Sequence, residues 1–304
     1  MPTSPFGRTV CAMVTPFTAD GALDLDGAQQ LADRLVGQGG CDGLVLSGTT
    51  GESPTTTDAE KTALVRAVVE AVGDRARITA GVGSASTRHT VELARAAEAA
   101  GAHGLLVVTP YYSRPPQEDV AEHFRTVADA TGVPVMLYDI PGRTGTRIEP
   151  DTMLRLAEHP RIAGVKDCSY DLLGSSKVMA RTGLAYYSGS EELNLPLLAA
   201  GAVGYVSTVA NVAGPLLAAT LDAYDRGDTA RATRLHQRAV PLVELMMAAG
   251  LPGTVTAKAL LNALGLPGGP VRAPLRAAAP DRVTRLLAAY EASGAEAGAA
   301  VGAP

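Results

Sequence analysis

The chain has 304 residues, of which 46% are hydrophobic and 19% are charged, so it can fill the core of one large domain or two ordinary ones. Its net charge of −5 and the lack of any Lys/Arg run argue against nucleic acid or an anionic membrane as the main partner. No apolar stretch reaches the roughly 20 residues of a bilayer span, and residues 1–10 lack the pattern of a signal peptide.

Short apolar runs alternate with longer Ala/Leu-rich segments over the first two-thirds of the chain. The runs, which we predict to be strands, are Thr9–Val14, Gly43–Leu46, Arg77–Val82, Gly104–Val108, Pro134–Tyr138, Ile162–Val165, Ala185–Tyr187 and Gly204–Ser207. The segments between them that are typical of helices include Asp58–Val72, Thr87–Ala100, Gln117–Thr131, Pro150–Glu158 and Glu191–Ala200. Asp58, Thr87 and Asp171 are the expected helix caps.

Strands separated each time by a helix indicate parallel βαβ units, whose strands are buried on both faces and therefore apolar throughout. Eight such units predict a (β/α)₈ TIM barrel. An open, doubly wound sheet remains the alternative, because periodicity alone does not distinguish the two.

The alternation stops after Ser207, and the helical segments that follow are Gly214–Arg226, Thr229–Ala249, Thr254–Leu264 and Pro280–Ala292. We therefore predict a catalytic barrel over 1–210, a helical extension over 211–292 that packs against it, and a disordered tail over 293–304.

Reactive side chains follow several of the predicted strands. The segments in question are Ser47–Ser53, Thr109–Tyr112, Tyr138–Gly145, Lys166–Asp167 and Ser188–Ser190. Because barrel enzymes carry their active sites at the carboxyl ends of the strands, we expect these groups to converge.

Lys166 closes the apolar run Ile-Ala-Gly-Val. An ordinary lysine is almost fully charged at neutral pH, whereas burial at a barrel mouth disfavours the charge and frees the lone pair for Schiff-base chemistry. Alone, Lys166 would be read as a solvated or salt-bridged lysine beside Asp167. Its position among the other strand-end groups favours the nucleophile.

Three other groups complete the predicted site. Tyr138 could relay protons, or be an amphipathic core tyrosine. The Gly-flanked pair Thr49–Thr50 suits a small carboxylate, although an ordinary βα turn would use the same residues. Arg143 could grip a second carboxylate, although alone it would be read as a surface arginine.

The three cysteines, Cys11, Cys41 and Cys168, are widely spaced and belong to no metal-binding motif, so we expect reduced thiols, a cytoplasmic location and no bound metal. No organic cofactor is expected either, because a protonated imine on the protein would itself act as the electron sink.

Taken in order, Gly-Thr-Thr-Gly-Glu-Ser, Thr-Pro-Tyr-Tyr, Tyr-Asp-Ile-Pro-Gly-Arg-Thr-Gly and Gly-Val-Lys-Asp resemble the dihydrodipicolinate synthase/N-acetylneuraminate lyase family. The similarity spans about Thr9 to Leu275. It implies that Lys166 forms an imine with pyruvate and that Tyr138 handles protons. It also implies that Thr50 links Tyr138 to Tyr112, which in the family reaches in from a neighbouring subunit.

The resemblance further implies that backbone groups of Thr49 and Thr50 hold the pyruvate carboxylate and that Arg143 meets the carboxylate of the aldehyde. The backbone carbonyl of Val206 is expected to line the site. Because a tyrosine shared between subunits needs two copies, at least a homodimer is implied, and tetramers are common in the family.

Thr50, Tyr112 and Arg143 favour the synthase branch, which condenses pyruvate with L-aspartate 4-semialdehyde to give 4-hydroxy-tetrahydrodipicolinate for lysine and diaminopimelate biosynthesis. A sibling aldolase, lyase or dehydratase acting on another aldehyde or sugar acid is the alternative. A non-catalytic pyruvate-binding barrel is disfavoured, because Lys166 and Tyr138 are both present.

Two departures from the family pattern stand out. Asp139 replaces the asparagine that usually follows the catalytic tyrosine, and we expect the change to be tolerated. In lysine-inhibited members the effector site uses an Asn, a Glu and a His, and the matching residues here are Ala85, His89 and Lys61. These replacements predict weak or absent feedback inhibition.

Overall fold

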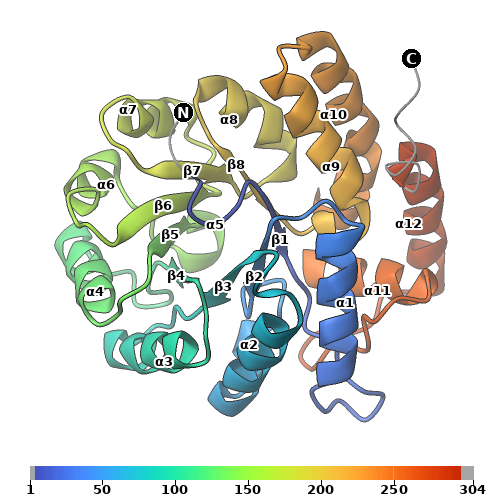
Figure 1. The fold of residues 1–304 in the computed structure, drawn as a ribbon, viewed down its shortest axis with the longest axis horizontal. Coiled ribbons are helices and arrows are strands. Elements are labelled where there is room, and N and C mark those ends of the chain that lie inside the picture. Colours follow the sequence, from blue (N-terminus) through green and yellow to red (C-terminus); the bar gives the residue numbers. More distant parts are fainter. Residues whose placement is uncertain (1–3, 249, 296–304) are drawn as a thin grey trace.

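The computed structural model describes residues 4–248 and 250–295. Within this part of the chain, eight parallel strands form one closed sheet in which each strand pairs with the next and β8 pairs with β1 (Figure 1). The predicted barrel is therefore confirmed, and the open doubly wound sheet is excluded. The strands are β1 (Thr9–Ala12), β2 (Gly43–Leu46), β3 (Arg77–Gly81), β4 (Gly104–Val108), β5 (Val135–Asp139), β6 (Ile162–Asp167), β7 (Ala185–Ser188) and β8 (Gly204–Ser207).

Helices surround the sheet, and Figure 1 shows them as an outer ring with α10–α12 set to one side. The helices of the ring are α1 (Leu25–Gly37), α2 (Asp58–Val72), α3 (Thr87–Ala99), α4 (Gln117–Asp129), α6 (Pro150–Leu156), α7 (Leu172–Met179), α8 (Asn194–Ala200) and α9 (Ala210–Asp225). Single turns form η1 (Ser53–Thr55), α5 (Pro141–Thr144) and η2 (Glu191–Leu193).

Two of the three predicted helix caps are displaced by one residue. The side chain of Thr57 accepts a hydrogen bond from the backbone of Glu60 and forms a capping box, so Asp58 is already inside α2. Ser86 caps α3 in place of Thr87. Asp171 caps α7 as predicted. In both wrong cases the capping residue is the last one with extended backbone, which a sequence of consecutive polar residues does not reveal.

The barrel interior and the space between sheet and helices form two separate apolar clusters. The interior cluster begins at Phe6, whose ring lies at the amino-terminal end of the barrel and faces the ring of Tyr187 at 6.1 Å. Gly104 and Gly164 lie so close to Phe6 that a Cβ on either would crowd the ring. The closed end therefore leaves the opposite end of the barrel for a site.

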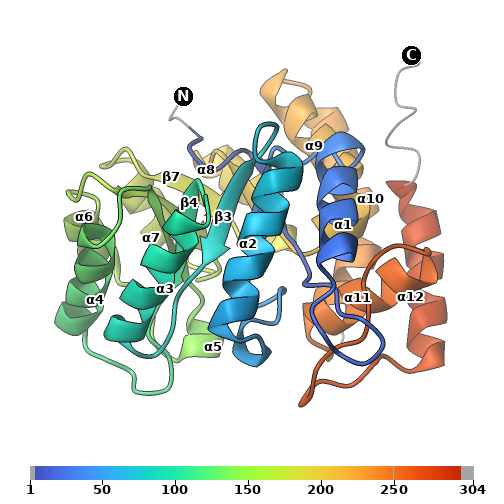
Figure 2. The same ribbon diagram turned by 60° about the horizontal axis from the view of Figure 1, so that its bottom comes forward.

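The C-terminal helices pack against one side of the barrel (Figure 2). They are α10 (Thr229–Val243), the π-helical turn η3 (Glu244–Ala248), α11 (Gly253–Ala263) and α12 (Pro280–Ser293). Helix α9 contacts β1 and α1 as well as α10 and α11, so it links the ring to the extension. The proposed division near residue 210 falls at the start of this helix.

Most of the segment predicted to be a disordered tail, residues 296–304, lies outside the described residues. Its first residues are packed, since Ser293 and Ala295 are buried. Across the described ranges, no single helix has both the length and the apolar composition to cross a membrane, and only Thr229–Ala248 together with Gly253–Ala263, joined at a sharp bend, meet that criterion as a pair.

Candidate active site

The loop between β2 and α2 is held rigidly at the open end of the barrel. A side chain at Gly51 would lie 3.0 Å from the Ser47 nitrogen, so this position has no room for a Cβ. The Thr15 hydroxyl donates to the Gly51 carbonyl at 2.7 Å, and the Thr254 hydroxyl donates to the Thr49 carbonyl at 3.2 Å. The loop is thus fixed from both the barrel and α11.

Lys166 lies within β6, beside Tyr138 of β5 in the sheet register. Its side chain is buried, and its Nζ lies 4.4 Å from the centroid of the Tyr138 ring. Burial lowers the pKa of the Lys166 ammonium, because a charge is poorly solvated in the barrel interior. The nearby Cys168 and Glu191 act in the opposite direction, whereas Arg143 lowers the pKa further. A larger fraction of this amine is therefore neutral at pH 7 than in an exposed lysine.

Burial shifts the pKa of Tyr138 in the opposite direction to that of Lys166. The phenol is buried, and burial raises its pKa well above the ordinary value, with Cys168 adding to the shift. Hydrogen bonding to Thr49 and the charge of Arg143 counteract part of this effect. The phenol keeps its proton at neutral pH, so a protonated donor lies beside a lysine whose pKa is lowered.

The two threonines of the loop have different surroundings. Thr50 is buried, and its hydroxyl lies 2.8 Å from the hydroxyl of Thr208, which follows β8. Among the described residues, no hydrogen bond joins Thr50 to Tyr138 or to Tyr112. Thr49 is exposed at the mouth of the barrel. The relay through Thr50 stays a prediction.

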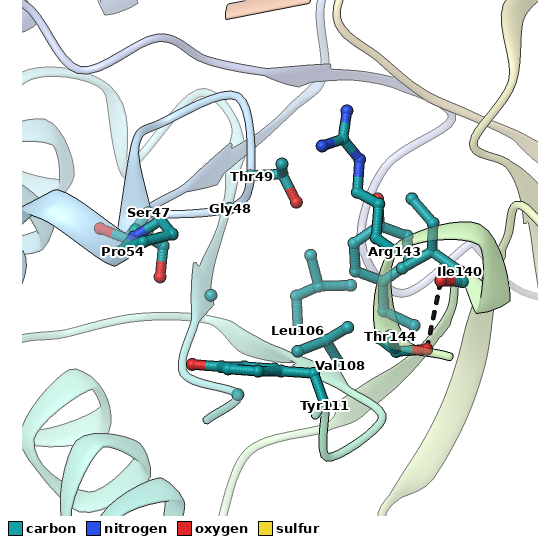
Figure 3. A pocket seen from close by; sticks show the side chains of 14 residues that line it. Ser47, Gly48, Thr49, Pro54, Leu106, Val108, Tyr111, Ile140, Arg143 and Thr144 are labelled. Atoms are coloured by element: carbon teal, nitrogen blue, oxygen red, sulfur yellow. Dashed lines mark hydrogen bonds between the residues drawn. The ribbon is translucent and has the colours of Figure 1, made fainter. Parts of the chain in front are cut away.

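Two adjoining cavities open at this end of the barrel, and Thr49, Tyr138, Ile140 and Arg143 line both. The larger, of about 600 Å³, also contains Lys166 and extends toward α10 and η3. The smaller, of about 230 Å³, appears in Figure 3, where Thr49 and Arg143 lie toward one end and the Tyr111 ring toward the other. Together they provide a chamber next to the amine, lined by both polar and apolar groups.

Arg143 is placed by the single turn α5 that follows β5. Gly145 ends this turn with a positive φ of 72° and donates its N–H to the carbonyl of Pro141. The side chain is exposed and lines both cavities, and its guanidinium lies on the same side as Thr49 (Figure 3). A cation at that position can bind an anionic group of a substrate that has entered the chamber.

Two predicted site residues, Tyr112 and Val206, line neither of the two cavities. Tyr112 is 95% exposed with a φ of 76°, and it lines neither cavity of its own chain. Val206 lies in β8 opposite Val10, with its side chain in the barrel interior. The roles expected for Tyr112 and for the Val206 carbonyl stay predictions.

Sequence reasoning missed Glu191, which follows β7 and lines the larger cavity. Its Oε1 accepts hydrogen bonds from Ser207 Oγ at 2.8 Å, Thr208 N at 2.7 Å and Val209 N at 3.0 Å. The only sequence signal was its position directly after Ser190, at the end of a predicted strand. A carboxylate fixed by three donors belongs to the architecture of the site.

No group of three or more His, Cys, Asp or Glu side chains suited to a metal ion occurs in residues 4–248 and 250–295. Cys168 lies two residues from Lys166, is buried and free, and burial raises its pKa to about 11. The thiol is therefore protonated at neutral pH and is a poor nucleophile. Lys166 is the better candidate for covalent chemistry in this chamber.

The sequence pattern of the Dihydrodipicolinate synthetase family matches residues 5–292. The chain belongs to this family. It is 74% identical over 295 residues to 4-hydroxy-tetrahydrodipicolinate synthase 1 of Streptomyces coelicolor, a match that covers 97% of this chain and 96% of the relative.

Solved structures of the family agree with the fold. Dihydrodipicolinate synthase from Cyanidioschyzon merolae, solved with lysine bound, superposes with a TM-score of 0.92 at 38% identity, covering 96% of this chain and 100% of the other. The chloride-inhibited dihydrodipicolinate synthase from Acinetobacter baumannii, complexed with pyruvate, superposes with a TM-score of 0.89 at 32% identity. The match covers 95% of this chain and 99% of the other.

Proposed function

We propose that the chain catalyses the condensation of pyruvate with L-aspartate 4-semialdehyde to give 4-hydroxy-tetrahydrodipicolinate, in the biosynthesis of lysine and diaminopimelate. The chain is then a lyase of the class I aldolase type. The observation that carries the proposal is the buried Lys166 amine beside the Tyr138 ring, in a cavity that also contains Thr49, Thr50 and Arg143. The 74% identical relative from Streptomyces coelicolor is named as a synthase of this product.

The mechanism begins with the neutral amine of Lys166. Its nitrogen attacks the carbonyl carbon C2 of pyruvate, and the former carbonyl oxygen leaves as water after receiving protons by way of Tyr138. The resulting iminium draws electrons away from C3, which loses a proton and becomes an enamine carbon. C3 then forms the new carbon–carbon bond to the aldehyde carbon, whose oxygen takes up a proton.

Binding of the two substrates is assigned to different parts of the chamber. The backbone of Thr49 and Thr50 holds the pyruvate carboxylate, and the Val206 carbonyl lines the same subsite. Arg143 binds the carboxylate of the semialdehyde, since a guanidinium pairs with a carboxylate through two parallel hydrogen bonds. The assignments of Thr49, Thr50 and Arg143 rest on the resemblance and on their place in the cavities, and that of Val206 rests on the resemblance alone.

We further propose that the protein is a homo-oligomer, a dimer or a tetramer, in which Tyr112 of one copy completes the relay of its partner through Thr50. The nearly full exposure of Tyr112 on a single chain supports this assignment, because a tyrosine seldom remains so exposed without a partner surface. The three free, buried thiols suit the cytoplasm, which is the expected location.

The test is reductive trapping of the imine. Borohydride with pyruvate should attach one pyruvate-derived group to the protein, and mass spectrometry should place it on Lys166. Lys166→Ala should abolish the attachment, whereas Arg143→Ala should keep it but lose turnover of aspartate semialdehyde. Labelling of Lys166→Ala to the same extent would contradict the assigned nucleophile. Faster turnover of a sugar acid than of aspartate semialdehyde would favour the sibling aldolase.

A further inference from the structure

The larger cavity contains a buried carboxylate for which the proposed mechanism has no role. Three acidic residues line it, Glu191, Glu192 and Glu244. Glu192 and Glu244 are exposed, and Glu192 accepts a hydrogen bond from the Tyr170 hydroxyl at 2.5 Å. Glu191 is only 3% exposed. An acidic group buried to this degree needs an explanation that the two solvated ones do not.

The two carboxylate oxygens of Glu191 have unequal surroundings. Oε1 accepts three hydrogen bonds, from the Ser207 hydroxyl and the backbone of Thr208 and Val209, which fixes the side chain. Oε2 is buried and has no hydrogen-bond partner among the residues that the structure describes. Leaving a buried charged acceptor unpaired is unfavourable, because it has lost its hydrogen bonds to water without gaining others. A donor supplied by a ligand would remove that cost.

Glu191 lines the same cavity as the reacting amine of Lys166. Its charge acts on Lys166, and Gly189, two residues earlier, packs against the lysine stem so closely that a Cβ there would be 3.0 Å from Lys166 Cε. Within the described chain, Lys166 Nζ nevertheless forms no ion pair, and it lies over the Tyr138 ring. The carboxylate therefore shares the cavity with any group bound to Lys166 and is free to bind another cation.

Aspartate semialdehyde supplies such a cation. It carries an aldehyde, a carboxylate and an α-ammonium group, and the residues assigned so far account for the first two. We propose that Glu191 Oε2 binds the α-ammonium group of this substrate and accepts its proton when the ring closes. The inference rests on the proposed function and adds the residue that recognises the amino group.

Ring closure transfers C2 of the adduct from the lysine nitrogen to the substrate nitrogen. The substrate ammonium gives a proton to Glu191, and the freed lone pair forms a bond to C2 of the Lys166 iminium, whose π pair moves to the lysine nitrogen. A proton then passes from the ring nitrogen to the lysine nitrogen. The bond between C2 and Lys166 breaks with its electron pair going to the lysine nitrogen, and the ring nitrogen gives its last proton to solvent, which leaves a cyclic imine. Lys166 is released as a neutral amine.

Glu191→Gln tests this role, because the glutamine oxygen can keep the three bonds of Oε1 while an NH₂ group replaces Oε2. We expect Lys166 still to be trapped with pyruvate at the wild-type stoichiometry and kcat/KM for aspartate semialdehyde to fall by about 100-fold or more. Borohydride should then trap an open-chain adduct of both substrates on Lys166. Glu192→Gln, which removes the neighbouring exposed charge, is the matched control and should lose less than about threefold, as expected for a screened surface charge.

Succinic semialdehyde is the second probe, since it has the aldehyde and carboxylate but no amino group. The wild type and Glu191→Gln should trap its adduct with pyruvate to the same extent. An equal loss with both aldehydes, loss of pyruvate trapping, or unchanged turnover of aspartate semialdehyde would each overturn the role of Glu191. Failure of the wild type to trap pyruvate would instead contradict the proposed function.

Discussion

Lys258 Nζ lies 2.6 Å from Glu52 Oε1, and both side chains are almost completely buried. The pair joins the loop between β2 and α2 to helix α11 of the C-terminal extension. Lys258 also donates to the carbonyl of Pro270 at 2.8 Å, and its Nζ lies 4.1 Å from the centroid of the Phe17 ring. The loop that carries Thr49 is thus anchored by an ion pair that solvent hardly reaches.

Lys258→Met should lower the free energy of unfolding by about 3–5 kcal/mol, because it leaves the Glu52 carboxylate buried without a cation. Urea denaturation measures the loss. Adding Glu52→Gln should recover much of it, since the double variant buries no unpaired charge. A single variant as stable as the wild type would mean that Glu52 finds another partner or takes up a proton.

Gly189→Ala should disable imine formation without unfolding the protein. The added methyl group would collide with the Cys168 sulfur and lie 3.0 Å from both Cγ and Cε of Lys166, so the lysine stem has to move. We expect the rate of pyruvate trapping to fall at least about tenfold, because displacing a reacting group by about 1 Å has large effects on rate. Gly183→Ala is the control, since a Cβ there meets nothing within 4 Å. Equal trapping by the two variants would contradict the prediction.

The barrel could be predicted because its strands are buried on both faces and appear as continuous apolar runs. The helices were harder. The sequence around Gly214 and Pro215 predicts a start at Gly214, yet α9 begins at Ala210. There the Asn211 side chain donates to the carbonyls of Ala12 and Thr208, which holds a first turn before a kink at Ala213. Contacts with a strand so distant in sequence leave no local pattern.

Some residues of the site could be predicted from the sequence and others could not. Lys166 and Tyr138 could be predicted because they end neighbouring strands, and strand ends converge in any barrel. The anchors of the site could not: Glu191 is identified by the three donors on its Oε1, and Glu52 by its contact with Lys258. These partners are brought together only by closure of the barrel and packing of the extension.

Asp139 should make the free energy of unfolding depend on pH. It lies beside Asp167 in the sheet register and accepts a hydrogen bond from Ile148 N at 3.1 Å. Burial raises its pKa to about 7; Asp167 and Asp171 add to this, whereas the Ile148 bond and Arg147 oppose it. The folded state therefore binds more protons than the unfolded state between about pH 4 and pH 7. Its stabilising effect is full below about pH 4 and is lost as the pH rises through 7.

Asp139→Asn should remove this loss, because the amide keeps the acceptor for Ile148 and has no charge to bury. At pH 8 the variant should be more stable than the wild type by roughly 3–4 kcal/mol, and the difference should vanish near pH 4. Thermal denaturation across this range is the measurement, with Asp74→Asn as an exposed control. A difference that does not change with pH would contradict the predicted titration.

Lysine should inhibit this enzyme weakly or not at all. A bound lysine presents two ammonium groups and one carboxylate, and the replacement of a family glutamate by His89 removes a carboxylate that could pair with an ammonium group. His89 Nε2 instead lies 2.8 Å from Asp58 Oδ2, and Lys61 adds a cation that donates to the Thr56 carbonyl at 2.6 Å.

Initial rates with millimolar lysine should therefore stay within about twofold of the rate without it, because the lost pairing and the added charge each oppose binding of a cation. Converting the matching positions with Ala85→Asn, His89→Glu and Lys61→His should create inhibition that the wild type lacks. Inhibition of the wild type by micromolar lysine would mean that other groups bind the effector.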